Sequence, residues 1–397
     1  MTNSQQGWIK PAKTLLTTIA FTAIASLVPQ AGLAQAGDKI RQEYPQLADL
    51  FNAFDITQAQ TFEAIATINA DPAYKTVRAG VREHLEMMKR MTMSEMMASG
   101  MMNHGGMNMT MSMNAASGPY PDMEVEARIK LLAVMRARHA DEEAAKAYVN
   151  NAAINRHTSV VLRRGRNFEN KLFEIYMDNS INNKQQAVQA AIADYLSDDR
   201  HSVSSSPKAG EFLLEHDQAT GFKTAFPRLS GLMWTQQWLQ LAALEAVILE
   251  TLDKQFTNSM DTVLERFWSK IGTDGGMSMF PPPSELPMAP AIAPDLYTQA
   301  PEAAIILDNL NILETVVADI LSYPNEEDRE TKMDAAVALF TSKEADNSHA
   351  ADYLLFALRG GIYNQGGPAI GKLTRSERNR SRDAMDMQHT STMGTGQ

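Results

Sequence analysis

Apolar positions recur at helical spacing along most of the chain. From Val161 onward, apolar or small residues return at Gly165, Phe168, Leu172 and Tyr176, which is one face of a helix. Alternating apolar and polar positions, the pattern of half-buried strands, are hard to find. The sequence therefore predicts an all-α protein. The expected helices lie near 40 to 54, 57 to 69, 72 to 97, 122 to 150, 155 to 179, 183 to 197, 209 to 219, 227 to 252 and 254 to 271.

These helices are expected to form a multi-helix bundle or a stack of helical hairpins, because each must bury its apolar face against another. The segment 229 to 252 is apolar on more than one face and is the candidate for a central helix. Trp234 and Trp238, four residues apart on that segment, are expected to lie in the core.

The composition divides the chain after the main run of helices. Residues 37–271 are expected to be the main helical domain, with a Met-rich loop at about 91–120. The Pro-rich stretch 272–300 predicts an extended linker, because it cannot sustain a helix. Helices near 301 to 322, 327 to 340 and 345 to 359 would form a smaller C-terminal helical unit over 301–365, followed by a disordered basic, Met-containing tail over 366–397.

The N-terminus has the order of a secretory signal peptide. Lys10 and Lys13 precede the apolar run LLTTIAFTAIASLV, and the stretch ends in Ala34-Gln35-Ala36, a small-residue cleavage site. We therefore expect residues 1–36 to be removed and the protein to be periplasmic or secreted. The apolar run is shorter than the ~20 residues of a spanning helix, so no transmembrane span is expected after cleavage.

Charge and cysteine content exclude several classes of partner and cofactor. Without the two lysines of the signal peptide, 34 basic residues face 47 acidic ones, a formal charge of −13 that argues against nucleic acid as a partner. The chain has no cysteine, which excludes disulfides, thiolate metal sites and CxxCH haem attachment. The stretch GGPAIGKLT at 366–374 misses the phosphate-loop pattern at Leu373, so no nucleotide is expected.

We find no pattern of catalytic residues, and a non-enzymatic protein is predicted. No HExxH, GxSxG or pair of Glu-x-x-His motifs occurs. The dispersed histidines are expected to be structural or solvated. The arginines of the 156–169 stretch could hold an anion, but pairing with acidic side chains is the simpler interpretation; they are Arg156, Arg163, Arg164 and Arg166.

Methionine is concentrated in one segment. Twelve of the 25 methionines lie between Met87 and Met113, and GMMNHGGMNMTMSMN has no helix period. A thioether is a soft, neutral donor that suits Cu(I) or Ag(I) and needs no deprotonation. The segment therefore predicts a metal site. Its candidate ligands are His84, Met87, Met88, Met91, Met93, Met96, Met97, Met101, Met102, His104, Met107, Met109, Met111 and Met113.

The MMNHGGMNMTMSM segment resembles the Met-rich, His-containing stretches of periplasmic copper-resistance and copper-transport proteins, with their MxM and MxxM spacings. The resemblance covers about residues 84–113 and is compositional. It implies Cu(I) binding, with a copper-accepting envelope protein as a possible partner, and it carries no fold or enzyme for the surrounding helices. Two smaller groups have a similar but weaker pattern. One is Met277, Met279 and Met288, and the other is Met385, Met387, His389 and Met393.

Three uses of the methionines remain open on the sequence. The first is an exported Cu(I)- or Ag(I)-binding protein that acts as a metal buffer or donor. The second is a non-enzymatic helical scaffold or adaptor of the cell envelope, in which the segment is an adaptable contact surface. The third is sacrificial, because exposed methionine oxidises reversibly to the sulfoxide.

Overall fold

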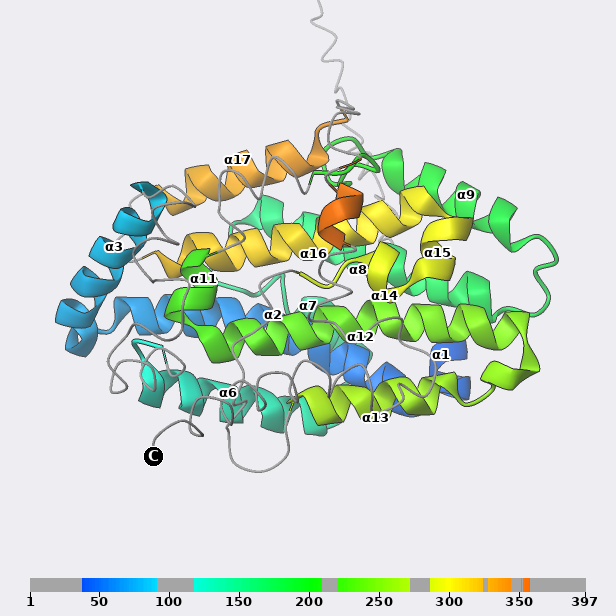
Figure 1. Ribbon diagram of the computed structural model, residues 1–397, viewed down its shortest axis with the longest axis horizontal. Coiled ribbons are helices and arrows are strands. Elements are labelled where there is room, and N and C mark those ends of the chain that lie inside the picture. The colour runs from blue at the N-terminus through cyan, green and yellow to red at the C-terminus, as the bar shows by residue number, and fades with distance from the viewer. Residues whose placement is uncertain are drawn as a thin grey trace, which may run out of the picture. The chain divides into compact units, whose positions relative to one another are not determined.

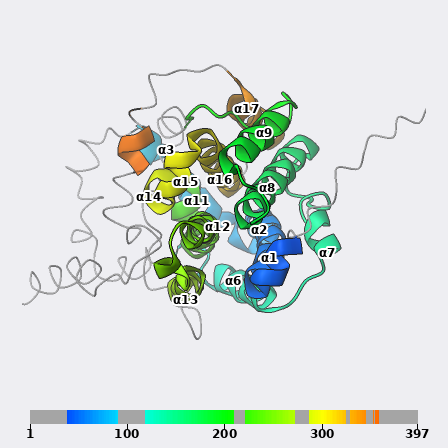
Figure 2. The same cartoon turned by 90° about the vertical axis from the view of Figure 1, so that its right-hand side faces the viewer.

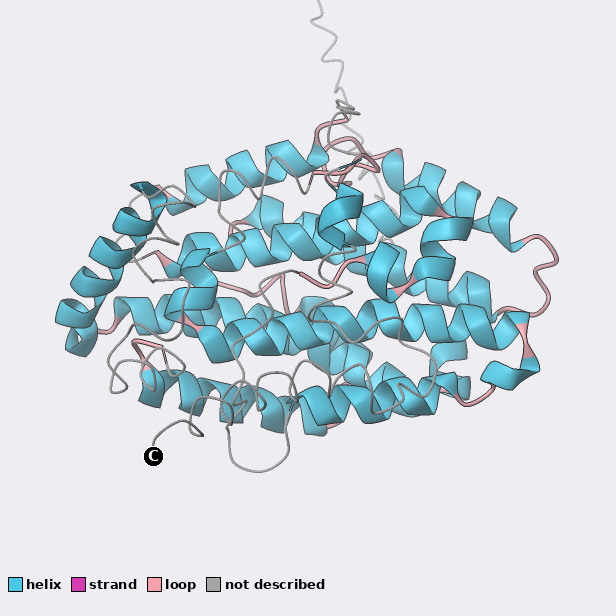
Figure 3. Cartoon of the chain, in the orientation of Figure 1, coloured by secondary structure: helices cyan, strands magenta, loops and turns pink. Residues whose placement is uncertain are grey.

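A computed structural model describes residues 38–90, 118–208, 220–271, 286–323, 328–343, 351 and 353–357. Within these ranges the chain is helical and has no strand, so the predicted all-α fold is confirmed (Figures 1 and 3). The α-helices are α1 (Asp38–Glu43), α2 (Pro45–Ala70), α3 (Lys75–Arg90), α6 (Pro121–Arg136), α7 (Asp141–Lys146), α8 (Arg156–Met177), α9 (Lys184–Leu196), α11 (Thr220–Ala225), α12 (Pro227–Leu252), α13 (Ser259–Ile271), α14 (Ala289–Ile292), α15 (Pro294–Gln299), α16 (Pro301–Ser322) and α17 (Arg329–Thr341). Two 3-10 turns, η1 (Pro72–Tyr74) and η2 (Lys254–Phe256), precede α3 and α13.

Four long helices, α2, α8, α12 and α16, lie at the centre of the described residues. Both α12 and α16 pack against α2 and against α8, and the end-on view of Figure 2 shows the four in cross-section. Helices α6, α13, α9 and α17 lie around them (Figure 2). A single hydrophobic core takes residues from all four central helices, among them Phe54, Leu172, Trp238 and Val317. The expectation that α12 is a central helix with core tryptophans is confirmed, because Trp234 and Trp238 are both buried.

Local sequence explains where α8 begins and which face it buries. The Asn155 side chain accepts a hydrogen bond from the Thr158 amide at 2.9 Å, which is a standard N-terminal cap. The face that carries Val161, Phe168 and Tyr176 is buried, as the apolar spacing predicts.

Several expected helix boundaries are wrong. The helix expected from 40 to 54 is interrupted at Tyr44, between the end of α1 at Glu43 and the start of α2 at Pro45. Helix α2 runs unbroken through Asp55 and Ile56, where two helices were expected, because Asp55 points into the core and pairs there with Arg166 instead of ending a helix. The expected helix from 122 to 150 is interrupted after Arg136. Ala137 is extended, and the carbonyl of Val134 at the helix end accepts the Ala137 amide at 3.0 Å and lies 2.9 Å from Nε2 of His139.

The expected extended linker is wrong for residues 286–299. This stretch holds α14 and α15, whose prolines stand in first helical turns, where a missing N–H costs nothing. Met288, Ile292 and Leu296 are completely buried. Helix α16 packs against α2, α8, α11 and α17 in the common core, so it does not belong to a separate C-terminal unit. The segments expected at 1–36, 209–219 and 366–397 lie outside the described residues.

Three helices receive their N-terminal caps from a distant helix. The residues before α12, α14 and α15 are apolar, and their side chains make no cap bond. A buried carboxylate from elsewhere accepts the free amides instead. Glu124 of α6 accepts from the Arg228 and Leu229 amides at 2.6 and 3.0 Å. Glu245 of α12 accepts from Asp295 and Leu296 at 3.0 and 3.1 Å, and Asp308 of α16 accepts from Ala289 at 2.8 Å.

Candidate functional site

Two of the predicted metal ligands, His84 and Met87, lie on the last two turns of α3. This helix is amphipathic, and its inner face carries Arg78, Val81 and Leu85, all buried. His84 is partly exposed, and Met87 is 39% exposed, so both stand off the buried face. The other candidates, from Met91 to Met113 with His104, and the side chain of Met88 lie outside the described residues.

The chain returns from the Met-rich segment beside the start of α3. The ring of Tyr120 lies 5.6 Å from that of Tyr74 and 5.2 Å from that of Phe226, so the residues before α6 are anchored in the core. Gly118 has a φ of 68°, and a Cβ there would lie 2.7 Å from Cδ of Pro227. This left-handed position next to a proline ring requires glycine.

A second site, which the sequence analysis missed, is a buried ionic network at the centre of the four long helices. Arg166 of α8 is its hub, with a side chain only 11% exposed. Its Nε forms an ion pair with Oδ1 of Asp55 of α2 at 2.8 Å, its Nη2 donates to Oε1 of Gln58 at 2.6 Å, and its Nη1 pairs with Glu169. Nη2 also lies 2.7 Å from the amide oxygen of Gln240 when that oxygen faces the guanidinium. The donors of Arg166 are therefore shared among α2, α8 and α12.

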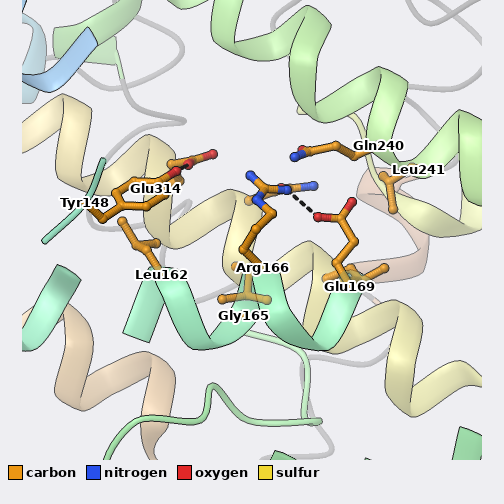
Figure 4. Close-up of a pocket in the computed structure, with 11 residues that line it drawn as sticks. Tyr148, Leu162, Gly165, Arg166, Glu169, Gln240, Leu241 and Glu314 are labelled. Atoms are coloured by element: carbon orange, nitrogen blue, oxygen red, sulfur yellow. Dashed lines mark hydrogen bonds and ion pairs between the residues drawn. The ribbon is translucent and has the colours of Figure 1, made fainter. Parts of the chain in front are cut away.

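A third acid, Glu314 of α16, completes the network without contacting the arginine. Its carboxylate accepts hydrogen bonds from the hydroxyl of Tyr148 at 2.7 Å and from Nε2 of Gln237 at 3.1 Å. The same hydroxyl lies 3.1 Å from Oε1 of Gln58, which also accepts from Arg166, so this acid lies next to the arginine hub. Figure 4 shows Glu314 and Tyr148 on one side of Arg166 and Glu169 on the other.

Burial dominates the electrostatics of the network. Burial raises the pKa of Asp55 to about 7, although the adjacent Arg166 acts in the opposite direction. Burial also raises the pKa of Glu314, against the influence of Arg166 and the Tyr148 hydrogen bond. Burial destabilises the charged forms of these carboxyl groups. This effect is larger than the stabilisation that they receive from the one guanidinium they share.

A small cavity adjoins the network, between α8, α12 and α16. Its lining is polar at Tyr148, Arg166 and Glu314 and apolar at Leu241 and Leu307 (Figure 4). The space open to the centre of a water molecule is about 20 Å³, which is room for about one water. A space of this size is too small for an organic ligand.

His139, His201 and Arg166 follow the simpler interpretation, whereas Arg164 bonds a backbone carbonyl instead of an acid. His139 contacts Glu143 at 3.2 Å, and His201 contacts Asp198 at 2.9 Å. Arg164 donates to the carbonyl oxygen of Tyr195 at 2.6 Å, and Arg166 pairs with acids, although inside the core instead of on the surface. Among the described residues, no three His, Asp or Glu side chains are grouped so that they could hold a metal ion. Met288, which belongs to one of the two smaller methionine groups, is completely buried and packs in the core.

The sequence held a signal for the network that spacing alone did not reveal. Asp55 and Glu314 each stand among apolar residues on a helix that is buried on most sides, as in FNAFDITQAQTF and LDNLNILETVV, whereas Arg166 follows two other arginines in LRRGRNF. A charge in that position must find a partner inside the protein. Which charges meet depends on how α2, α8 and α16 pack, and these residues are far apart in the chain.

Comparison of the chain with protein-family models, with curated proteins and with solved structures finds no match. The fold and site define an all-α protein with four central helices, a buried ionic network among them and a methionine-rich segment between α3 and α6. None of the described helices combines the length and the hydropathy that a membrane crossing requires.

Proposed function

We propose that the protein is an exported, non-enzymatic Cu(I)- or Ag(I)-binding protein that buffers the metal or donates it to an envelope partner. The observation that carries the proposal is the concentration of methionine. Between Met87 and Met113 the chain holds 12 of its 25 methionines, together with His104. Soft thioether donors prefer soft monovalent ions, and three or four of them must converge on one ion.

The position of the segment supports the proposal. His84 and Met87 present a nitrogen and a sulfur donor on adjacent turns of α3, outside its buried face. This pair is held by a helix whose inner residues Val81 and Leu85 are packed in the core. Because these two donors are already held in place, less conformational entropy is lost when the remaining ligands bind the ion.

The length of the segment also supports the proposal. The Tyr74 and Tyr120 contact places the end of the segment near the start of α3, and α3 spans about 24 Å at 1.5 Å per residue. Residues 91–117 could extend over roughly 90 Å. The connection is therefore several times longer than its two ends require. The surplus chain is what a segment needs to bring several methionines around one ion.

A competition titration tests the proposal. The mature protein, residues 37–397, would be titrated anaerobically with Cu(I) against a chromogenic Cu(I) chelator, in parallel with a variant in which the ten methionines from Met91 to Met113 are leucine. We expect the native protein to withdraw at least one equivalent and the leucine variant to withdraw less, because leucine keeps the bulk and removes the sulfur. Met123→Leu on α6, outside the segment, is the control and should titrate like the native protein.

The same variants separate this function from the contact-surface alternative. If neither native protein nor variant competes with the chelator, metal binding is wrong. A contact surface would then be supported if the leucine variant keeps its interactions and a serine variant of the same ten positions loses them. The sacrificial use predicts instead that sulfoxide forms in the segment before any other methionine of the native protein is oxidised.

A further inference from the structure

The charges of the buried network do not balance. Three carboxyl groups, from Asp55 of α2, Glu169 of α8 and Glu314 of α16, face one guanidinium, that of Arg166. The other elements packed against the network contribute neutral groups: α12 gives Gln237 and Gln240, and the turn before α8 gives Tyr148. If all three acids were ionised, the centre of the protein would carry two uncompensated negative charges.

Glu314 is the acid with the weakest compensation. The groups that bond it are a phenol and an amide, both uncharged. Glu314 is 3% exposed, so water does not replace the missing cation. An ionised carboxylate in that position costs several kcal/mol, and protonation removes the cost.

The network also has a route by which protons can be exchanged. Arg166 lines the small cavity between α8 and α16 and keeps 11% of its side chain exposed. At the same interface a Cβ added at Gly165 would lie 2.2 Å from Cδ2 of Leu310, so the two helices approach closely there. The network therefore lies next to this close contact between α8 and α16, and it reaches solvent through the exposed part of Arg166.

We propose that the Asp55, Arg166 and Glu314 network is a proton-operated latch that holds α16 against α2 and α8. With a proton on Asp55 and on Glu314, only the Arg166 and Glu169 pair is charged, and the helices stay closed. When the two carboxylic acid O–H groups release their protons to water, two negative charges remain in the core. Local separation of α16 then lets water reach them.

The direction of the pH dependence follows from burial. The folded pKa of Asp55, at about 7, lies above its ordinary value, and the pKa of Glu314 is raised in the same direction. Stability from such groups is fully present below the unfolded pKa and is lost as pH rises through the folded pKa. The latch is therefore closed in mildly acidic solution and loosens as the solution becomes alkaline.

Hydrogen exchange tests the latch. Amide protection of α16 would be measured at pH 5.5 and 8.5, corrected for intrinsic exchange, in the native protein and in Glu314→Gln. In the native protein we expect the protection of the amides around Glu314 to fall by about tenfold or more from pH 5.5 to pH 8.5. The reason is that one unit of pKa shift changes the equilibrium between closed and open α16 by a factor of ten. Glu314→Gln, which keeps a side chain of the same shape without the charge, should show a smaller fall. Glu265→Gln, at an exposed position on α13, should behave like the native protein.

Equal protection of native α16 at both pH values would overturn the latch, and so would a native-sized fall in Glu314→Gln. If Glu314→Gln does not fold, carboxyl carbon NMR on the native protein decides the matter. The carboxyl carbon assigned to Asp55 or to Glu314 should then titrate with a midpoint above pH 6. If both of these carboxyl groups titrate below pH 6, the network is not protonated near neutrality and the proposal fails.

Discussion

At the scale of single residues, small and polar side chains inside the core set how closely the central helices approach. Gly165 is the clearest case, because it lies on the buried face of α8 where that helix meets α16. A Cβ added there would lie 2.2 Å from Cδ2 and 2.9 Å from Cγ of Leu310. The whole leucine side chain would have to move, and its neighbours are already packed.

We expect Gly165→Ala to lower the free energy of unfolding by about 1–3 kcal/mol, because overpacking forces side chains off their preferred rotamers. Urea unfolding would measure the change. Gly80→Ala is the matched control: Gly80 is also helical, and a Cβ there meets nothing within 4 Å. Since alanine is the better helix former, the control should gain about 0.5–1 kcal/mol. If both variants move in the same direction, the close contact at Gly165 is not what sets the spacing.

At the scale of helices, the starts of α12, α14 and α15 depend on carboxylates that belong to other helices. The clearest example is Glu245 of α12. Its carboxyl group accepts hydrogen bonds from the amides of Asp295 and Leu296, the second and third residues of α15. The residue before α15 is Ala293, which offers no cap of its own. The start of this short helix is therefore stabilised by a tertiary contact and not by a local cap.

Glu245→Ala should destabilise the protein by about 1–3 kcal/mol, because two buried amides lose their acceptor. Chemical denaturation would give the value. Glu302→Ala in the first turn of α16 removes an exposed glutamate and should change stability by less than about 0.5 kcal/mol. A Glu245 variant as stable as this control would mean that water caps α15 equally well.

At the scale of the molecule, the described helices share one hydrophobic core instead of dividing into a main domain and a C-terminal unit. Helix α16, which the sequence assigned to the smaller unit, is buried along almost its whole length. Asp308 of this helix also bonds the start of α14 and the hydroxyl of Tyr353 at 2.6 Å. The C-terminal helices and the helices before them are therefore one packed unit.

Unfolding should accordingly be a single cooperative transition. In a protein of residues 37–397, which lacks Trp8, tryptophan fluorescence reports Trp234, Trp238 and Trp268 on α12 and α13, whereas far-UV circular dichroism reports all helices. We expect the two transitions in urea to coincide, as they do for one cooperative core. A separate dichroism transition without a fluorescence change would show that the helices after residue 300 unfold independently.

Much of the helical framework could be predicted from sequence, because periodicity and proline are local signals. Helices α12 and α16 begin and end at the expected residues, and α8 and α9 are within one or two residues of them. The errors lie where a side chain acts at a distance. Two separate helices were expected on either side of Asp55, and an extended linker was expected where α14 and α15 lie. Partners across the core, Arg166 for Asp55 and Glu245 and Asp308 for the starts of α15 and α14, accompany the helices found there.

The two candidate sites differ in the same way. The Met-rich segment could be found from sequence because its signal is the density of one residue type over a short range. The ionic network could not, because Asp55, Arg166 and Glu314 come from three helices and only packing brings them together. Asp55 and Glu314 each show a local signal, a charge within an apolar helix, which marks the residue but not its partner, and Arg166 lies in a charged stretch that gives no such signal.

The distant caps have a consequence for how the chain folds. Glu124 and the first amides of α12 are separated by 104 and 105 residues, and Glu245 and the start of α15 by 50 and 51. Neither helix has a polar side chain of its own before its first turn, so neither start is secured until the loop that joins it to its partner has closed. Contacts of such long range slow folding. These helices are therefore expected to acquire stable ends late, when the core assembles, and not one by one along the chain.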